Sequence, residues 1–360
     1  MRVAIVHYWL VGMRGGEAVL ETLLEMYPEA DIFTHVYDQD TVSAQINSRK
    51  VVTTFINRLP FSRKYYKYYL PFMPIALEQL DLTDYDLVIS CESGPSKGII
   101  TKPEALHVCY CFSPMRYIWD LTGFYQRDKN WLIKLVLMPI IHYLRIWDVS
   151  SACRPDVIVT LSNFTRQRIK KFWGRSSVVI PPPVNIDVDV NVKPLNSDYY
   201  IYAGELVAYK RVDLVIEAFN DNGKELVIAG DGEEFDRLKS MAKDNVSFAG
   251  RLDNKQFFER IAGAKALVFP GVEDFGLIPV EAMCLQTPVI AFGRGGVLDS
   301  VEDGKTGLFF AEQTAKSLNK AVSRFESLDL KISDECSKGV HNQFSAERFK
   351  TQFKELLNSI

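Results

Sequence analysis

Short apolar runs alternate with amphipathic stretches along most of this chain. Runs such as RVAIVHYW, ADIFTHVYD, YDLVISCESG, ALHVCYC and PDVIVT in the first half are typical of buried strands. The second half repeats the pattern in YYIYAGEL, ELVIAG, NVSFAG, ALVF and TPVIAF. Segments of roughly 10–15 residues with helical periodicity separate the runs, as in parallel sheets joined by right-handed crossovers. The pattern therefore predicts an α/β protein made of doubly wound sheets.

A proline run separates the two sets of strands. At 360 residues the chain exceeds what one hydrophobic core usually serves. Residues 181–183 are all proline, which cannot continue a helix and stiffens the connection, as an interdomain hinge requires. We predict a first domain over residues 1–183 and a second over 184–340. The amphipathic segment 341–360 is expected to cross back onto the first domain.

Two carboxylates dominate the stretch ALVFPGVEDFGLIPVEA (266–282). Glu273 and Glu281 stand eight positions apart around a Phe-Gly turn. Glu273 follows an apolar strand, and Pro279 suits the first position of a helix that would carry Glu281 in its first turn. Both should lie at the carboxyl end of a parallel sheet, where open α/β sheets bind ligands, beside free N–H groups that suit a phosphate. The stretch thus predicts an anionic, hydroxyl-rich ligand.

A second glycine-containing turn, VGMRGG, follows the first strand. Gly15 and Gly16 stand where this strand leads into a helix that begins at about Glu17. Glycine at such a junction lets a ligand approach the backbone closely. A plain tight turn is the alternative interpretation, and the strand–loop–helix context favours ligand contact.

Between Thr41 and Leu77 the chain has no acidic residue and six basic ones, with aromatic residues between them. Basic and interfacial aromatic side chains together suit an anionic membrane surface, each cation adding about 1 kcal/mol. One alternative is a solvated loop whose aromatic rings pack on the core. Nucleic acid is the other, and no nucleic-acid fold signature supports it. The apolar, partly basic stretch 131–147 is predicted to be helical and to form a second membrane-facing element.

Charge is unevenly distributed along the chain. Basic against acidic residues number 21 against 17 for 1–183 and 21 against 28 for 184–360, so +4 and −7 sum to the net −3. The chain starts on a strand pattern rather than a secretory leader, and no run reaches about 18 uninterrupted apolar residues. We expect a cytoplasmic protein that is peripheral at the inner face of a bacterial cytoplasmic membrane.

Two segments carry a family resemblance. GVEDFGLIPVEAMCLQTPVIAFGRGG resembles the E-x7-E segment, and GELVAYKRVDLVIEAF the Gly-x-Leu…Lys segment, of the family 4 retaining glycosyltransferases of the GT-B fold. HYWLVGMRGGEAVLE and SPMRYIWD are similar to a bacterial subgroup that includes mannosyltransferases of O-antigen and exopolysaccharide synthesis on a lipid carrier. The resemblance covers nearly the whole chain. It implies two Rossmann-like domains facing across a cleft, the first binding the acceptor and the second the nucleotide-sugar.

The resemblance also implies roles for the matching residues. Glu281 would hold the ribose hydroxyls of the nucleotide, and Glu273 would bind hydroxyls of the donor sugar. Lys210, with neighbouring Arg211, would neutralise the diphosphate, although either alone would be read as a surface charge. The other implied donor-side positions are Gly16, Gly204, Arg251, Leu252 and the backbone amides of Phe275, Gly276 and Leu277, and the acceptor-side positions are Arg116 and Tyr117.

Fixed cations and dipoles, rather than a metal, are expected to stabilise the charge that develops on the leaving diphosphate. No metal ligand and no cofactor is assigned; the nucleotide-sugar is a substrate. Two positions depart from the family pattern. Glu205 stands where the family usually has Arg, so Arg211 or Arg294 would have to replace that cation. Phe112 stands where the subgroup commonly has His, and His107 on the preceding strand reads as a core residue.

The function hypothesis is transfer of a hexose, with mannose from GDP-mannose as the best guess, to a lipid-linked saccharide or other oligosaccharide acceptor. Glu205 and Phe112 motivate a second hypothesis, a non-catalytic glycosyltransferase-like subunit that binds or regulates an active enzyme. A transferase that uses a UDP-sugar and a sugar-nucleotide epimerase of the same fold are further alternatives.

Overall fold

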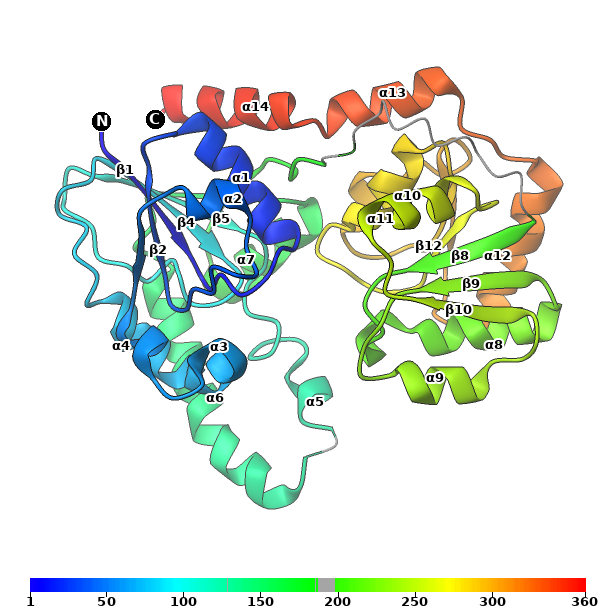
Figure 1. The fold of residues 1–360 in the computed structure, drawn as a ribbon, viewed down its shortest axis with the longest axis horizontal. Helices are drawn as coiled ribbons and strands as arrows, with labels where there is room; N and C mark the ends of the chain where they lie inside the picture. Colours follow the sequence, from blue (N-terminus) through cyan, green and yellow to red (C-terminus); the bar gives the residue numbers. More distant parts are fainter. Residues whose placement is uncertain (128, 185, 187–197) are drawn as a thin grey trace. The chain divides into compact units, whose positions relative to one another are not determined.

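The computed structural model of the chain describes residues 1–127, 129–184, 186 and 198–360 (Figure 1). Residues 185 and 187–197 of the predicted second domain lie outside the described residues. The chain divides into two compact units. Met1–Pro183 and Phe349–Ile360 form one, and Val184–Arg348 form the other.

The first unit is built on a parallel sheet. Its strands follow the order β3-β2-β1-β4-β5-β6-β7, and every neighbouring pair is parallel. All five residues of the central strand β1 are buried, which explains its unbroken apolar sequence. The strands are β1 (Val3–His7), β2 (Asp31–Thr34), β3 (Val51–Thr53), β4 (Leu87–Glu92), β5 (Leu106–Cys111), β6 (Val157–Thr160) and β7 (Val178–Val179).

Helices and short helical turns connect these strands. The longer ones begin at clear caps: the Asn130 side chain accepts from the Ile133 N–H before α6, and Ser162 accepts from the Thr165 N–H before α7. The helices are α1 (Gly15–Met26), α2 (Ala44–Asn47), η1 (Phe55–Arg58), α3 (Ser62–Tyr65), η2 (Tyr66–Phe72), α4 (Met73–Leu77), α5 (Thr122–Tyr125), α6 (Trp131–Ser151) and α7 (Asn163–Trp173).

The second unit repeats the same plan. Its parallel strands follow the order β10-β9-β8-β11-β12-β13. The strands are β8 (Tyr199–Ala203), β9 (Glu225–Ala229), β10 (Val246–Gly250), β11 (Leu267–Phe269), β12 (Val289–Phe292) and β13 (Gly307–Phe310). The helices are η3 (Ala208–Lys210), α8 (Val212–Asn222), α9 (Phe235–Met241), α10 (Asn254–Ala262), α11 (Leu277–Cys284), η4 (Gly296–Asp299), α12 (Ala315–Leu328) and α13 (Asp334–Gln343).

The last helix is α14 (Ala346–Asn358), and the chain from Phe349 to Ile360 belongs to the first unit. Phe349 and Phe353 of α14 are buried, and the Phe349 ring packs 5.6 Å from the ring of Tyr110 on β5. Lys350 of α14 pairs with Glu25 of α1 at 2.7 Å. The last helix is therefore an integral part of the first unit.

Strand order reverses once in each sheet, between β1 and β4 in the first unit and between β8 and β11 in the second. At such a switch point the loops that follow the two strands diverge, which leaves room for a ligand at the carboxyl edge of the sheet. The two Rossmann-like parallel sheets confirm the predicted α/β fold class. Within the described residues, no helix combines the length and the apolar character needed to cross a bilayer.

Candidate functional site

Lys210 and Glu273 meet at the switch point of the second sheet. Lys210 ends η3, in the connection after β8, and Glu273 lies in the loop after β11. The Lys210 Nζ atom is 2.9 Å from the Glu273 Oε1 atom, and both side chains are mostly buried. Burial by itself lowers the pKa of the Lys210 ammonium, but the Glu273 carboxylate outweighs it and the pKa is raised. Lys210 is thus a fixed cation at neutral pH.

Two glycines make room for this pair. Gly204 follows β8 with φ +142°, and a Cβ atom there would lie 3.4 Å from the Lys210 Nζ atom and 3.3 Å from the Tyr202 hydroxyl. Gly271 passes against the Lys210 backbone, where a Cβ atom would come within 3.2 Å of the Lys210 Cα atom. Glycine at 204 leaves room for the Lys210 ammonium, and glycine at 271 lets the loop after β11 pass close to the Lys210 backbone.

The start of α11 offers backbone donors beside the pair. Gly276 caps this helix with φ +90°, a conformation that favours glycine. Among the described residues, none accepts a hydrogen bond from the backbone N–H groups of Phe275, Gly276 or Leu277. Phe275 and Gly276 are buried. Unsatisfied N–H groups at a helix N-terminus, where the helix dipole is positive, form an anion site.

Glu281 lies further along the same helix. Because α11 begins at Leu277, Pro279 occupies its third position and Glu281 its second turn, so the prediction that the helix starts at Pro279 is wrong by two residues. The Glu281 side chain is largely buried and makes no hydrogen bond or ion pair with any described residue. Burial raises the pKa of its carboxyl to about 7. A buried acceptor without a donor suits a ligand hydroxyl.

The other predicted cations fall into two groups. Arg211 has φ +59° and its guanidinium is held by Asp213, with Nε 3.1 Å from Oδ1. Arg251, which follows β10, and Arg294, which follows β12, are exposed, and neither forms an ion pair with a described residue. The loop that carries Arg294 is tied to the site, because the Gly296 N–H donates to the Glu273 carbonyl at 2.9 Å. Leu252 is half-buried beside Arg251, and Glu205 is exposed beside Gly204.

In the first unit, Gly16 lies at the start of α1, where close packing needs a glycine. A Cβ atom on Gly16 would come within 2.6 Å of the Tyr8 hydroxyl and 3.6 Å of the Phe112 ring. Packing inside the protein is therefore enough to require glycine here, without any contact between Gly16 and a ligand. Phe112 packs edge-on against Tyr8, with the ring centroids 6.2 Å apart, so an apolar ring fills this position.

Arg116 and Tyr117 lie between β5 and α5 and are both half-buried. Arg168 of α7 fixes the start of this segment by donating to the Pro114 carbonyl at 3.2 Å and to the Asp120 carboxylate at 2.7 Å. The Tyr117 hydroxyl is buried and has no hydrogen-bond partner among the described residues. The segment is well held but keeps an unused donor, as an acceptor-binding loop would.

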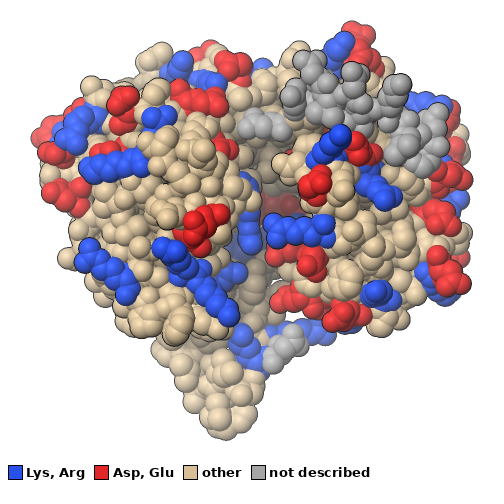
Figure 2. Space-filling model, viewed as in Figure 1, with Lys and Arg blue, Asp and Glu red and all other residues tan. Residues whose placement is uncertain are grey.

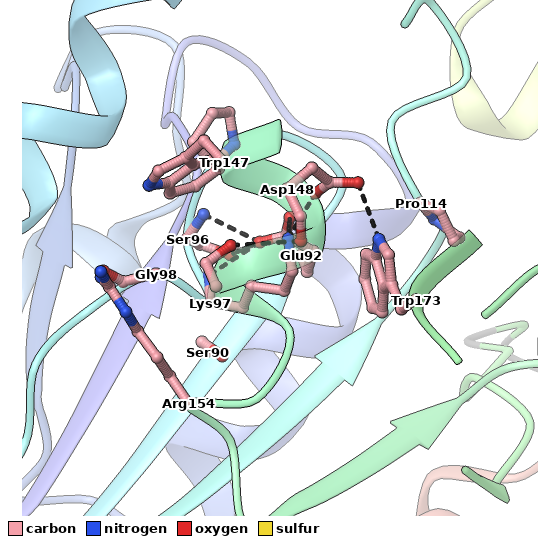
Figure 3. A network of polar contacts seen from close by, with 12 residues as sticks. Ser90, Glu92, Ser96, Lys97, Gly98, Pro114, Trp147, Asp148, Arg154 and Trp173 are labelled. Carbon is pink, nitrogen blue, oxygen red and sulfur yellow. Dashed lines mark hydrogen bonds and ion pairs between the residues drawn. The ribbon is translucent and has the colours of Figure 1, made fainter. Parts of the chain in front are cut away.

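A buried charge cluster under this loop was missed by the sequence reasoning (Figure 3). Lys97 is completely buried and pairs with Glu92 at 3.2 Å and with Asp148 of α6. The indole N–H groups of Trp119 and Trp173 each donate to the Asp148 Oδ2 atom at 2.7 Å. The available signals were the carboxylate that ends β4 and the single acidic residue in the apolar sequence of α6.

Asp-x-Asp triplets, which can chelate a metal together with a diphosphate, are present at 38–40, 84–86 and 187–189. In the first two, the acidic residues Asp38, Asp84 and Asp86 are paired with Arg63, Arg2 and Lys102. The third lies outside the described residues. Among the described residues, no three His, Cys, Asp or Glu side chains gather in a metal-binding arrangement.

Two family sequence models together match residues 13–342 of the chain. The model described as Glycosyltransferase Family 4 matches residues 13–188, and the model described as Glycosyl transferases group 1 matches residues 185–342. The first match runs from the loop after β1 past β7, the last strand of the first unit. The second match includes the loops and the helix that carry Lys210, Glu273 and Glu281.

Curated relatives match the chain over shorter segments. An uncharacterised glycosyltransferase of Methanocaldococcus jannaschii is 27% identical over 172 residues, which cover 46% of this chain and 48% of the relative. The human alpha-1,3/1,6-mannosyltransferase ALG2 is 28% identical over 153 residues, which cover 40% of this chain and 36% of the relative. The chain thus spans about half or less of the length of the curated relatives it matches.

Solved structures match over the whole chain. Sucrose-phosphate synthase from Thermosynechococcus elongatus aligns with a TM-score of 0.74 at 16% identity, covering 100% of this chain and 99% of that one. Anabaena Alr3699/HepE in complex with UDP-glucose aligns with a TM-score of 0.70 at 15% identity, covering 100% of both chains. These similarities establish the GT-B fold.

The two family models together account for residues 13–342, and they meet at the boundary between the two units. On this basis, the chain belongs to the group 1 glycosyltransferases of family 4.

Proposed function

We propose that this protein is a retaining, metal-independent glycosyltransferase that moves a hexose from a nucleotide diphosphate sugar to an acceptor hydroxyl. One observation carries the proposal. At a single sheet edge, the chain places a fixed cation (Lys210), a carboxylate paired with it (Glu273), unused backbone N–H groups (275–277) and a buried carboxylate without a partner (Glu281). These groups supply the cation, the hydrogen-bond donors and the hydrogen-bond acceptors that a nucleotide diphosphate sugar requires.

The proposed chemistry uses each group in one role. Glu281 accepts from the ribose hydroxyls, while the N–H groups at the start of α11 donate to the diphosphate. On donor binding, Glu273 turns to the sugar hydroxyls and Lys210 to the diphosphate. As the bond from the anomeric carbon to the phosphate oxygen breaks, negative charge grows on the leaving group, and the preorganised cation and N–H groups stabilise it. The leaving phosphate oxygen takes the proton of the acceptor hydroxyl on the same face of the sugar.

Arg294 is proposed as the second cation of the site. Arg211, its alternative, is already held by Asp213, whereas Arg294 forms no ion pair with a described residue and stands on the loop bonded to the Glu273 backbone. Arg294 would then replace the arginine that the family usually has at the position of Glu205.

The proposed donor is GDP-mannose, and a UDP-sugar is the alternative. The mannosyltransferase name of the human relative supports mannose, and the UDP-glucose complex of the Anabaena protein supports a UDP-sugar. Donor choice depends on contacts near Glu273 and Arg251. The proposed acceptor is a lipid-linked saccharide of cell-surface polysaccharide synthesis, bound on the side of Arg116 and Tyr117.

An acceptor of this kind places the protein at the inner face of a cytoplasmic membrane. Residues 41–77 carry no acidic side chain, and the exposed cations Arg63, Lys64 and Lys67 accompany exposed rings such as Phe61 and Tyr68. Replacing the three cations with Glu is expected to reduce sedimentation with anionic vesicles. Unchanged sedimentation would reject this electrostatic contact.

The test of the transfer itself is a donor panel. Purified protein is incubated with sugar nucleotides and a saccharide acceptor pool, and products are identified by mass. Wild type is expected to add one hexose from one donor, and Glu281→Ala is expected to abolish the addition because the ribose anchor is gone. Full transfer by Glu281→Ala would sink the assignment.

A non-catalytic binding subunit is the second candidate. It is favoured by the pairing of both predicted diphosphate cations with carboxylates, Lys210 with Glu273 and Arg211 with Asp213, and by the exposed Glu205 nearby. A protein of this kind should bind sugar nucleotides weakly or not at all, and isothermal titration distinguishes it from an enzyme.

A further inference from the structure

The first three turns of α6 expose apolar side chains to solvent over more than half of the helix circumference. Trp131 is 70% exposed, Val136 63% and Met138 62%, and six further large apolar residues of the helix are at least 40% exposed. These six are Leu132, Ile133, Leu135, Tyr143, Ile146 and Val149. Figure 1 shows this end of α6 extending beyond the rest of the first unit, and Figure 2 shows no acidic or basic side chain on its tip in that view. Such a surface is rare on a folded protein without a partner.

The distribution of these residues around the helix tells what kind of partner they fit. Residues 131, 132, 133, 135, 136 and 138 are all exposed and apolar, and steps of about 100° per residue spread them over about 220° of the helix circumference. The rest of the circumference holds Lys134, Leu137 and Ile141, which are half-buried. A second protein chain would cover one face of a helix and leave a polar stripe opposite. An exposed apolar surface wider than half of the helix, with no exposed polar residue within 131–138, is matched by an apolar medium that surrounds the tip of the helix.

Charges flank this end in the manner of a membrane-inserting element. Arg127 and Lys129, just before the helix, are exposed. Lys134 is the one basic residue within the first three turns, and its long side chain can reach the headgroups while its methylenes stay among apolar neighbours. Trp131 at the helix start is the residue type favoured at the interface between headgroups and acyl chains.

The opposite half of α6 is firmly anchored in the first unit. Asp148 belongs to the buried cluster with Lys97 (Figure 3). Leu144 and Trp147 pack in the same apolar cluster as Leu77 of α4. The Arg145 Nε atom donates to the Ile118 carbonyl at 2.6 Å. The exposed end therefore projects from a fixed base, which also holds the segment that carries Arg116 and Tyr117.

We propose that the first three turns of α6 insert into the interfacial and outer acyl region of a lipid bilayer and dock this protein on it. The insertion goes beyond the electrostatic contact proposed for residues 41–77, and it depends on neither the donor nor the acceptor of the proposed transfer. The exposed Phe72 and Ile75 lie on the segment 66–77, whose Leu77 packs in the same apolar cluster as Leu144 of α6. Binding through apolar insertion of α6 persists at high salt, whereas the electrostatic contact of residues 41–77 is screened.

Vesicle flotation of the full chain tests the proposal, without donor or acceptor present. Wild type is expected to float with phosphatidylcholine vesicles containing phosphatidylglycerol, and to remain bound in part at high salt. Replacing Leu132, Leu135, Val136 and Met138 with Gln is expected to weaken binding by roughly 10–100-fold, since each removes an apolar group from the bilayer. Leu298→Gln/Leu328→Gln is the control, since both side chains are 52% exposed, similar to the four on α6.

Tryptophan fluorescence gives a second readout that a general loss of structure does not imitate. Of the five tryptophans, Trp131 alone is exposed. Lipids brominated on the acyl chain are expected to quench the wild-type emission, and the quenching is expected to disappear in Trp131→Phe.

Two results would overturn the proposal. In the first, salt abolishes flotation, the four-residue variant floats as wild type does, and Trp131 is not quenched. Electrostatic contact would then be the whole interaction. In the second, wild type does not bind vesicles but forms a dimer, and the four-residue variant is a monomer. The exposed surface of α6 would then be covered by a second copy of this chain.

Discussion

Glu281→Gln should stabilise the ligand-free protein at alkaline pH while removing its ability to hold a nucleotide. The carboxyl of Glu281 is buried on α11 without a partner among the described residues, and its pKa is raised from 4.5 to about 7. The folded state therefore binds this proton more tightly than the unfolded state does. The stability that this carboxyl contributes is fully present below pH 4.5 and is lost as the pH rises through 7.

The magnitude follows from that pKa difference. Each pH unit corresponds to about 1.4 kcal/mol, so the carboxylate should lower the free energy of unfolding by on the order of 3 kcal/mol at pH 8. Glutamine has nearly the same shape and no charge, so it removes this penalty. For a unit of this size, the gain corresponds to a rise of roughly 5–10 °C in Tm.

Scanning calorimetry at pH 4.5 and pH 8 measures the effect. The Tm of Glu281→Gln is expected to exceed that of wild type at pH 8 and to equal it at pH 4.5. Glu217→Gln, at an exposed position on α8 of the same unit, serves as the control and should change Tm at neither pH. A variant that gains nothing at pH 8, or gains the same at both pH values, would refute the reasoning.

Three further predictions concern neighbouring features. Asp148→Ala leaves the buried Lys97 with one carboxylate, so urea unfolding should show a free energy of unfolding lower by about 3–5 kcal/mol. Asp84→Ala, which removes one partner of an exposed ion pair, is the control and should change that free energy by less than about 1 kcal/mol. Gly204→Ala should lower stability by roughly 1–3 kcal/mol because of its φ of +142°, while Gly339→Ala, in a helix with open space around it, should not lower Tm. Arg294→Ala should weaken nucleotide diphosphate binding about 10-fold in isothermal titration; affinity equal to wild type would exclude it from the site.

The element pattern was predictable because its signals are local. Unbroken apolar runs such as RVAIVH mark strands that are buried on both faces, and the structure places β1 in the interior of its sheet, between β2 and β4. Glu273 could be assigned to a loop from the apolar run before it, and Glu281 to a helix from the helix-forming residues around it. The start of that helix was misplaced because Pro279 was taken as its first residue, whereas Gly276, with φ +90°, sets the actual start.

Weaker local signals explain the missed elements in the tail. The strand β13 has four residues, GLFF, after a Gly- and Asp-containing turn, too short to be told from a loop by periodicity. The segment 41–77 shows a related difficulty. It folds into short helices in which Tyr66 is buried in a small apolar cluster, while Phe61 and Tyr68 are exposed, so its aromatic residues serve both packing and surface roles.

Ion pairs between residues far apart in the chain could not be predicted from the sequence, for a different reason. Lys210 and Glu273 are joined by an ion pair only because β8 and β11 are neighbours at the switch point of the sheet, which strand order decides. The same holds for Lys97 and Asp148, which lie on a loop and on α6. Residue types and spacings indicated which groups could act at the site, and the sheet topology determined which of them meet.

The central claim is that the edge of the second sheet binds a nucleotide diphosphate sugar, and isothermal titration of the full chain with GDP-mannose and UDP-glucose tests it most directly. Wild type is expected to bind one of the two with one-to-one stoichiometry, and Glu281→Ala is expected to lose that binding while Glu217→Ala keeps it. Wild type that binds neither, or Glu281→Ala that binds as tightly as wild type, would contradict the account.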